Sequence, residues 1–220
     1  MSDTGPTADE IRAELLWAAQ EMLRSGLVEG TAGNLAARLP DGNVVLTPSS
    51  TPYDTMTVDD LVTCTPDGEV VDGHRSPTTE KALHLTVLRA YPELGATMHC
   101  HAKHVTMFAI THQPIPAVVE EFDVYVGGDV ACTEYRETGT QELADEVART
   151  MADRAAVVMA NHGLFCAGRS PRDALHIAAL VERTAEIVWG ARQLGPIVGV
   201  PDEIGAKYAS FYRFGRTGSF

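Results

Sequence analysis

Apolar residues recur at helical spacing in five separate segments of this chain. In the first, Thr7 and Glu10 stand three residues apart ahead of an apolar stripe, which is the pattern of a capping box at a helix N-terminus. Gly26 follows that stripe, where a helix commonly ends, and Pro92 and Pro196 stop two of the other segments. The spacing predicts helices over 7–25, 78–91, 102–111, 140–151 and 173–194.

Short apolar runs typical of β-strands lie between these helices. Asp41-Gly42 separates two such runs, and Asp67-Gly68 separates two more. Because Asp-Gly is a strong signal for a hairpin turn, each pair of runs is predicted to form a β-hairpin. The last run is uninterrupted and apolar, as expected of a buried strand. The pattern predicts strands at 34–38, 43–47, 61–65, 69–71, 96–101, 130–133 and 155–160.

Two stretches outside these elements stand out by their composition. Residues 120–123 form an acidic cluster ahead of a Gly-Gly pair, and such a cluster is usually a solvated face. The C-terminal tail is aromatic and basic, so we expect it to pack against another surface, such as that of a neighbouring subunit. Its residues of this kind are Tyr208, Phe211, Tyr212 and Arg213.

Composition narrows the class of protein. With 220 residues, 45% apolar and 21% charged, the chain fits one folded domain, which we place at 7–220 after a disordered tail at 1–6. The formal net charge of -13 argues against nucleic acid or an anionic membrane as a partner. No apolar run approaches the roughly 20 residues of a membrane span. There is no signal peptide and no C-x-x-C pair, so we expect a cytoplasmic protein with reduced thiols.

Two histidines, His99 and His101, stand at the end of an apolar, β-prone run. On an extended strand, residues i and i+2 point to the same face, so both imidazoles could bind one metal ion. In isolation the same pair could equally be one packed and one solvated histidine. His162 closes the last buried run and precedes Gly163, a good position for a third ligand. With Glu80 as a fourth ligand or as an acid/base beside the metal, these residues form a catalytic Zn²⁺ set.

Three further stretches have the composition of anion-binding segments. The small residues at 30–34 would let the backbone approach an anion closely, or they form an ordinary glycine turn. The hydroxyl-rich stretch 47–52, which holds two prolines, could bind phosphate or serve as a turn. Thr78 and Thr79 open a helix; free N–H groups there bind anions, or the two threonines simply cap the helix.

Five short motifs spread over residues 10–195 occur together in one known family, in the same order and spacing. They are Gly-Thr-Ala-Gly-Asn at 30–34, Leu-Thr-Pro-Ser-Ser at 46–50 followed by Pro-Tyr at 52–53, Pro-Thr-Thr-Glu at 77–80, His-Cys-His-Ala-Lys-His at 99–104 and Asn-His-Gly-Leu-Phe at 161–165. On these motifs the chain resembles the class II aldolase/adducin family. Within it, the resemblance is greatest to the bacterial L-fuculose-phosphate aldolases.

The resemblance implies a three-layer α/β/α sandwich around a mostly antiparallel sheet, assembled as a homotetramer with active sites between subunits. It implies one divalent metal ion per subunit, usually Zn²⁺, on His99, His101 and His162. Glu80 would leave the metal to act as the base. The substrate would be a small phosphorylated sugar, and the residues implied to surround its phosphate are Gly33, Asn34, Ser49, Ser50, Thr78 and Thr79.

The implied reaction is cleavage of a ketose 1-phosphate, with L-fuculose 1-phosphate the best single candidate. The products would be dihydroxyacetone phosphate and an aldehyde, formed through a metal-stabilised enediolate. Two positions depart from the family pattern. Ser50 stands where the family usually has Gly, which adds a donor and narrows the pocket. Glu121 stands where these aldolases carry a catalytic Tyr; it could transfer the aldehyde proton, or Tyr208 or Tyr212 could supply a phenol instead.

The same family contains pentulose-phosphate 4-epimerases, methylthioribulose-phosphate dehydratases and sugar-acid-phosphate decarboxylases. The predicted metal ligands do not separate these enzymes, because all of them use a similar metal site. An adducin-like domain, in contrast, keeps the fold without the metal and serves in binding or structure. The intact set of three histidines and a carboxylate argues against that last class.

Overall fold

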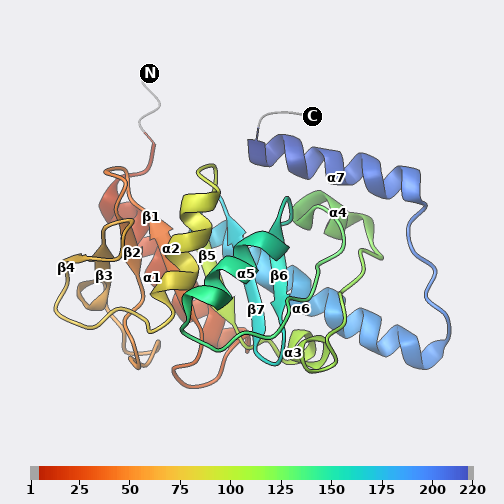
Figure 1. Ribbon diagram of the computed structural model, residues 1–220, viewed down its shortest axis with the longest axis horizontal. Helices are drawn as coiled ribbons and strands as arrows, with labels where there is room; N and C mark the ends of the chain where they lie inside the picture. Colours follow the sequence, from red (N-terminus) through yellow and green to blue (C-terminus); the bar gives the residue numbers. More distant parts are fainter. Residues whose placement is uncertain (1–4, 218–220) are drawn as a thin grey trace.

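A seven-stranded sheet runs through the middle of the molecule, in a computed structural model that describes residues 5–217 (Figure 1). Its strands are β1 (Asn34–Arg38), β2 (Val44–Leu46), β3 (Val62–Cys64), β4 (Val70–Asp72), β5 (Ala96–Cys100), β6 (Ala156–Met159) and β7 (Gly163–Gly168). The order across the sheet is β4-β3-β2-β1-β5-β7-β6, and each pairing between neighbours is antiparallel. The expected antiparallel sheet is therefore confirmed.

Helices cover both faces of this sheet. They are α1 (Ala8–Arg24), α2 (Lys81–Ala90), α3 (Lys103–Ile110), α4 (Glu120–Val126), α5 (Gln141–Met151) and α6 (Pro171–Leu194), with a short 3-10 helix η1 (Val58–Asp60). Side chains alternate along each strand, so Leu35 and Ala37 of β1 pack into the core under α1 and α6, and Ala36 packs under α2 and α5. This is the three-layer α/β/α sandwich that the family resemblance implied.

The first helix begins where the sequence predicts. Thr7 Oγ1 accepts a hydrogen bond from the backbone N–H of Glu10, and the Glu10 carboxylate accepts one from the backbone N–H of Thr7 at 2.8 Å. Two N–H groups that the helix itself leaves unpaired are satisfied in this way. The predicted capping box is confirmed.

The second helix begins later than its hydroxyl residues predict. Thr78 and Thr79 were predicted to cap it, but Glu80 occupies the N-cap position and the helix starts at Lys81. Thr78 instead belongs to the preceding loop, where its N–H donates to the carbonyl of Thr47 at 3.2 Å. Its hydroxyl accepts from the N–H of Glu80 at 3.2 Å. The capping prediction was wrong, and the correction places Glu80 at the start of the helix.

Helix α4 and strand β7 were not predicted from the sequence, and one predicted strand does not form. The acidic segment 120–123 begins helix α4, where Phe122 and Asp123 are buried, so it is more than a solvated face. Strand β7 fills the sheet between β5 and β6. The strand predicted at 130–133 was wrong, since this segment makes only isolated bridges to Ile115 and to β6.

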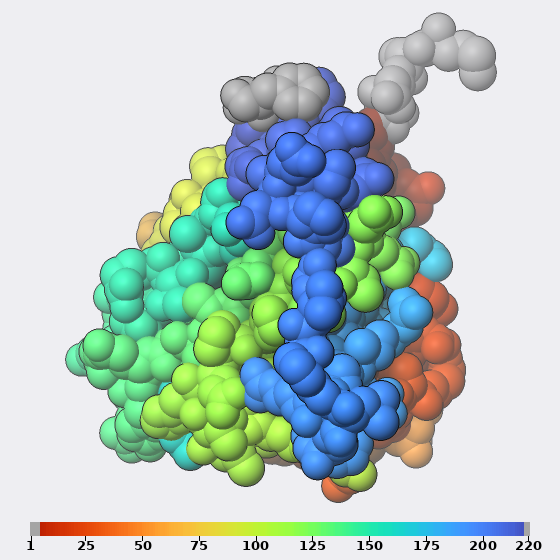
Figure 2. Space-filling model, turned by 90° about the vertical axis from the view of Figure 1, so that its right-hand side faces the viewer, coloured from red at the N-terminus to blue at the C-terminus, as the bar shows by residue number. Residues whose placement is uncertain are grey.

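The C-terminal tail forms a helix, α7 (Asp202–Thr217), that packs against α4 of the same chain. The connection that precedes α7 crosses the surface of the body in an extended form (Figure 2). Arg216 ties the helix down by an ion pair with Glu93 at 2.7 Å, and the ring of Tyr212 lies against Gly127. The tail therefore packs as expected, and the surface that it covers belongs to its own chain.

The disordered tail predicted at 1–6 falls mostly outside the described residues, and the single domain predicted over 7–220 stays a prediction. Within residues 5–217, no helix combines the length and the apolarity needed to cross a membrane.

Candidate metal centre

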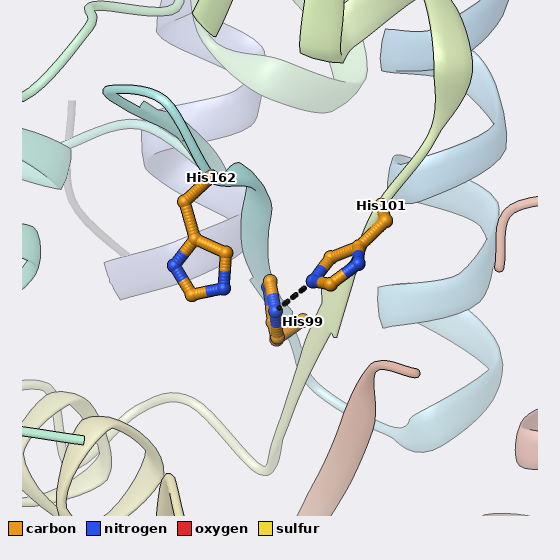
Figure 3. A group of neighbouring side chains, drawn as sticks. All are labelled: His99, His101 and His162. Carbon is orange, nitrogen blue, oxygen red and sulfur yellow. Dashed lines mark hydrogen bonds between the residues drawn. The ribbon is translucent and has the colours of Figure 1, made fainter. Parts of the chain in front are cut away.

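Three histidines meet at one end of neighbouring strands, where β5 ends and β6 turns into β7 (Figure 3). His99 is the fourth residue of β5 and pairs with Phe165 of β7. His101 follows directly after the strand, and His162 occupies the turn between β6 and β7. The potential ligand nitrogens of the three rings all lie within 4.8 Å of one another. The structure therefore brings together the three histidines that the sequence singled out.

The spacing of these nitrogens suits a small tetrahedral ion. The Nε2 atoms of His99 and His101 are 3.0 Å apart, and the ring of His162 lies 4.6 Å from that of His99 between centroids. Ligand nitrogens of a tetrahedral Zn²⁺ stand about 3.3 Å apart, since each Zn–N bond is about 2.0–2.1 Å. The Nδ1–H of His99 donates to the carbonyl of Leu164 at 2.9 Å. This bond fixes the tautomer and leaves Nε2 free to bind a metal.

The three imidazoles are neutral at pH 7, which is the form that binds metal. Burial lowers the pKa of His99 to about 3, and partial removal from water lowers the pKa of His101 and of His162 as well. A protonated imidazole has no free lone pair for a metal ion. A cation can therefore bind at the site without first displacing protons from the imidazoles.

Glu80 lies against two of these rings from the start of α2. Its Oε2 is 3.4 Å from Nε2 of His99, and its Oε1 is 3.6 Å from Nε2 of His162. The side-chain amide of Asn34 donates to Oε2 at 2.8 Å. Burial alone would raise the pKa of Glu80, but the neighbouring His99 and the Asn34 amide outweigh it, so the pKa of Glu80 is lowered. Glu80 is therefore an ionised carboxylate within reach of a metal on the histidines.

Two residues of the site were not identified from the sequence. Thr138 donates its hydroxyl to Oε1 of Glu80 at 3.4 Å and lies 3.2 Å from Nδ1 of His162. Nothing in its surrounding sequence marks it. His84 hydrogen-bonds Asn34 from the buried side of α2. The sequence could have singled out His84, because it is a histidine in an otherwise apolar helical stripe.

Gly33 and Asn34, two of the predicted phosphate-binding residues, lie at the start of β1 next to His99. Gly33 has φ +76°, and a Cβ there would lie 2.7 Å from the backbone oxygen of His99, so only glycine fits. Its carbonyl accepts from the hydroxyl of Tyr53 at 2.6 Å. Asn34 pairs with His99 across the β1–β5 ladder. Both residues therefore border the histidine cluster.

The other predicted phosphate-binding residues lie on two loops that are tied to each other. The N–H of Ser49 donates to the carbonyl of Ser76 at 2.9 Å, which joins the loop after β2 to the loop before α2. The hydroxyls of Ser49 and Ser50 are 3.4 Å apart, and Ser50 has φ +53°, a conformation that favours the glycine usual in the family. Thr78 is buried and Thr79 is exposed. Their phosphate-binding role stays a prediction.

The residues predicted to transfer the aldehyde proton lie elsewhere in the chain. Glu121 is half exposed on α4, where it pairs with Arg183 of α6 at 3.1 Å. Tyr208 makes a ring contact with Phe211, and Tyr212, also on α7, packs against the hydrophobic core. None of the contacts among residues 5–217 joins these three to the histidines. A catalytic role for Glu121 stays a prediction, and it requires a second subunit.

Close packing at Gly163 holds the turn that carries His162. A Cβ on Gly163 would lie 2.5 Å from the carbonyl oxygen of Cys100 and 3.3 Å from the ring of His101. We expect Gly163→Ala to lower the free energy of unfolding by about 1–3 kcal/mol and to weaken metal binding. Gly190→Ala is the matched control, since its Cβ meets nothing within 4 Å and helix α6 gains from alanine. Urea unfolding measures the stability of the two variants, and equal stability would contradict this packing.

Burial of His84 makes stability depend on pH in a defined window. His84 is fully buried, and burial lowers its pKa to about 4. Between pH 6.5 and about 4 the unfolded chain binds a proton at this residue and the folded chain does not, so acid favours unfolding. Through this residue, acidification across the whole window lowers the free energy of unfolding by about 3 kcal/mol. Urea unfolding of metal-free protein between pH 7 and 4.5 should show a steeper loss of stability for the wild type than for His84→Gln; parallel slopes would contradict it.

Comparison with known proteins identifies the class to which this fold and site belong. A family model described as the class II aldolase and adducin N-terminal domain matches residues 13–189. The chain therefore belongs to the class II aldolase and adducin family, as its motifs indicated.

Individual relatives include enzymes of more than one activity. The L-ribulose-5-phosphate 4-epimerase UlaF of Salmonella paratyphi B is 33% identical over 208 residues, 88% of this chain and 90% of that protein. The 5-deoxy-D-ribulose 1-phosphate aldolase of Bacillus thuringiensis serovar kurstaki is 32% identical over 193 residues, 87% and 90% of the two chains. Among solved structures, an L-fuculose 1-phosphate aldolase superposes with a TM-score of 0.89 at 30% identity, covering 95% of this chain and 98% of its own.

Proposed function

We propose that this protein is a metal-dependent aldehyde-lyase that acts in the cytoplasm on a ketose 1-phosphate. It cleaves the sugar to dihydroxyacetone phosphate and an aldehyde, and L-fuculose 1-phosphate is the best single candidate. The observation that carries this proposal is the ionised Glu80 at 3.4 Å and 3.6 Å from two of three neutral histidines. A carboxylate beside an electrophilic ion suits proton transfer at a carbon next to a carbonyl.

The donor set fits a divalent ion, and Zn²⁺ fits it best because Zn²⁺ prefers few, tetrahedral nitrogen ligands. When bound, such an ion supplies Lewis acidity that stabilises negative charge on the substrate oxygens as the carbon–carbon bond breaks. His99, His101 and His162 hold the ion. Glu80 delivers a proton to the carbon that loses the aldehyde, and in the reverse direction it removes that proton.

The remaining roles are assigned by position in the family pattern, including Ser50 and Glu121, where this chain departs from the family residue. The substrate phosphate binds at the two joined loops and the start of β1, through Gly33, Asn34, Ser49, Ser50, Thr78 and Thr79. Glu121 of a neighbouring subunit handles the proton of the aldehyde oxygen. Exposed apolar side chains on α3 and α6 support assembly as a homotetramer, since Ile110, Trp189 and Leu194 are 60%, 47% and 92% exposed in the single chain.

Subunit mixing tests whether the site is shared between subunits. Chains carrying Glu121→Ala and chains carrying His162→Ala should each be inactive alone. Co-assembled, they should recover about a quarter of the wild-type activity, because one site in four would combine two intact contributions. Recovery of none, with the mixed oligomer verified by mass, would place Glu121 outside the site.

A 4-epimerase is the second candidate, because an L-ribulose-5-phosphate 4-epimerase is 33% identical to this chain. The two reactions share the bond that breaks, between C3 and C4. In the epimerase the aldehyde fragment stays bound, turns its other face and recombines. The two substrates differ in carrying the phosphate at C1 or at C5.

Product analysis on the two substrates decides between these reactions. Zn²⁺-loaded protein is incubated with L-fuculose 1-phosphate, and dihydroxyacetone phosphate is followed with a coupled dehydrogenase. In parallel, L-ribulose 5-phosphate is incubated and the pentulose 5-phosphates are separated. Chelator-sensitive release of dihydroxyacetone phosphate is expected. Absence of release together with formation of the C4 epimer would overturn the aldolase assignment; turnover of neither would direct the search to dehydratase and decarboxylase substrates.

A further inference from the structure

A fully buried histidine stands behind the metal centre without touching it. His84 lies on the inner side of α2, among Leu83, Leu85 and Val87, with its ring 5.5 Å from that of Phe165. Its Nδ1 is 2.7 Å from the hydroxyl of Thr97, and its Nε2 is 2.6 Å from Oδ1 of Asn34. An apolar residue would fill this place without the cost of burying two polar nitrogens. The hydrogen bonds of His84 therefore need an explanation beyond packing.

The carboxylate of Glu80 fixes the direction of this chain of bonds. Only an N–H can face an ionised oxygen at 2.8 Å, so the amide nitrogen of Asn34 must point at Oε2 of Glu80. The amide oxygen then faces His84, so Nε2 of His84 carries its proton. Its Nδ1 consequently accepts from the hydroxyl of Thr97. Each polar side-chain atom in the series from Thr97 to Glu80 therefore has a hydrogen-bond partner.

We propose that His84 is a positioning residue: its Nε2–H holds the amide of Asn34, so that Oε2 of Glu80 stays beside His99 and Oε1 stays beside His162. Without the Nε2–H of His84, the amide oxygen of Asn34 loses this donor, so the amide is no longer held from behind and its bond to Oε2 of Glu80 loosens. Glu80 would then move away from His99 and His162. Oε1 is the oxygen that Thr138 also contacts, at 3.4 Å. The inference rests on the proposed role of Glu80 as acid/base, and it holds for either sugar.

Two replacements separate the hydrogen bond from the space that the ring fills. His84→Gln keeps an amide N–H near the place of Nε2, whereas His84→Phe fills the cavity and cannot donate. For His84→Phe we expect kcat to fall roughly 10- to 100-fold with KM unchanged, and Zn²⁺ affinity of the stripped protein to fall by a similar factor. His84→Gln should restore most of both. His176→Phe is the control, since His176 is exposed on α6 and contacts Tyr125 instead.

The tautomer of His84 gives a readout that needs neither turnover nor a variant. Long-range ¹H–¹⁵N spectra of the wild type, with Zn²⁺ removed and added back, should show the Nε2–H form with a proton protected from exchange. An Nδ1–H form would overturn the proposal, as would equal loss in His84→Phe and His84→Gln, which would indicate a purely structural role. Wild-type kcat and Zn²⁺ affinity in His84→Phe would overturn it too. If the wild type turns over no ketose phosphate, the proposed function fails, while tautomer and metal affinity still decide this inference.

Discussion

Replacing His162 with alanine should abolish both metal binding and turnover. His162 is one of the three histidines of the proposed metal site, and its turn brings it within reach of Glu80 as well, at 3.6 Å. Two remaining imidazoles cannot hold a catalytic divalent ion in the closed geometry that three provide. The side chain is 19% exposed and lies in a turn, so little of the core is lost and the variant should fold. Metal content after gel filtration and turnover in added Zn²⁺ measure the effect.

His176→Ala serves as the control for the loss of a histidine. It removes an exposed imidazole of α6 that is absent from the cluster of three. This control should keep one metal ion per subunit and wild-type turnover. A folded His162→Ala variant with full activity would refute the metal assignment.

Glu80→Gln should keep the metal and lose turnover by roughly 10²- to 10⁴-fold. Glutamine has the shape of glutamate, and its oxygen can still accept from the amide of Asn34, which now bonds Oε2 at 2.8 Å. The three histidines remain, so metal stays bound, but the side chain can no longer carry a proton. Steady-state kinetics and metal analysis on the same sample measure both quantities.

Glu182→Gln is the matched control for removing a partly buried carboxylate. Glu182 accepts from the backbone N–H groups of His104 and Val105 at the start of α3, and it pairs with the ring of His104 at 2.8 Å. We expect that variant to lose stability and keep its kcat. Undiminished turnover in Glu80→Gln would remove Glu80 from the acid/base role.

The three-histidine cluster could be predicted from the sequence because the features that mark each histidine are local. His99 and His101 share a face since a strand repeats every two residues, and the structure places them at the end of β5. His162 follows a buried strand and precedes a glycine whose missing Cβ allows close approach to Cys100. Each of these features is written within a few neighbouring residues.

The contacts that support the site could not be predicted, because they join residues far apart in the chain. His84 reaches Asn34, fifty positions earlier, and Thr138 reaches Glu80 from a loop without periodicity. No rule of spacing relates such pairs; only the folded sheet brings them together. The prediction that Thr78 caps α2 was wrong for a similar reason, since the N–H of Thr78 donates to the carbonyl of Thr47 on another loop.

Helix α4 and strand β7 were missed because burial by neighbouring elements defines them more than their local sequence does. Helix α4 begins with two glutamates, and its buried side is visible only once α6 and α7 lie beside it. Strand β7 starts and ends with glycine and is buried along its whole length, so no alternation of polar and apolar residues marks it. The two glutamates of α4 and the two glycines of β7 therefore hid the short apolar runs that these segments contain.

A titration of metal-stripped protein with Zn²⁺ is the most direct test of the three-histidine site and its chemistry. Bound metal and cleavage of the substrate found in the product analysis are followed in the same samples. We expect saturation at one ion per subunit, with turnover rising from zero in step with the bound ion. Full turnover by the stripped protein, or activity that rises without any ion bound at the histidines, would contradict the metal-dependent mechanism.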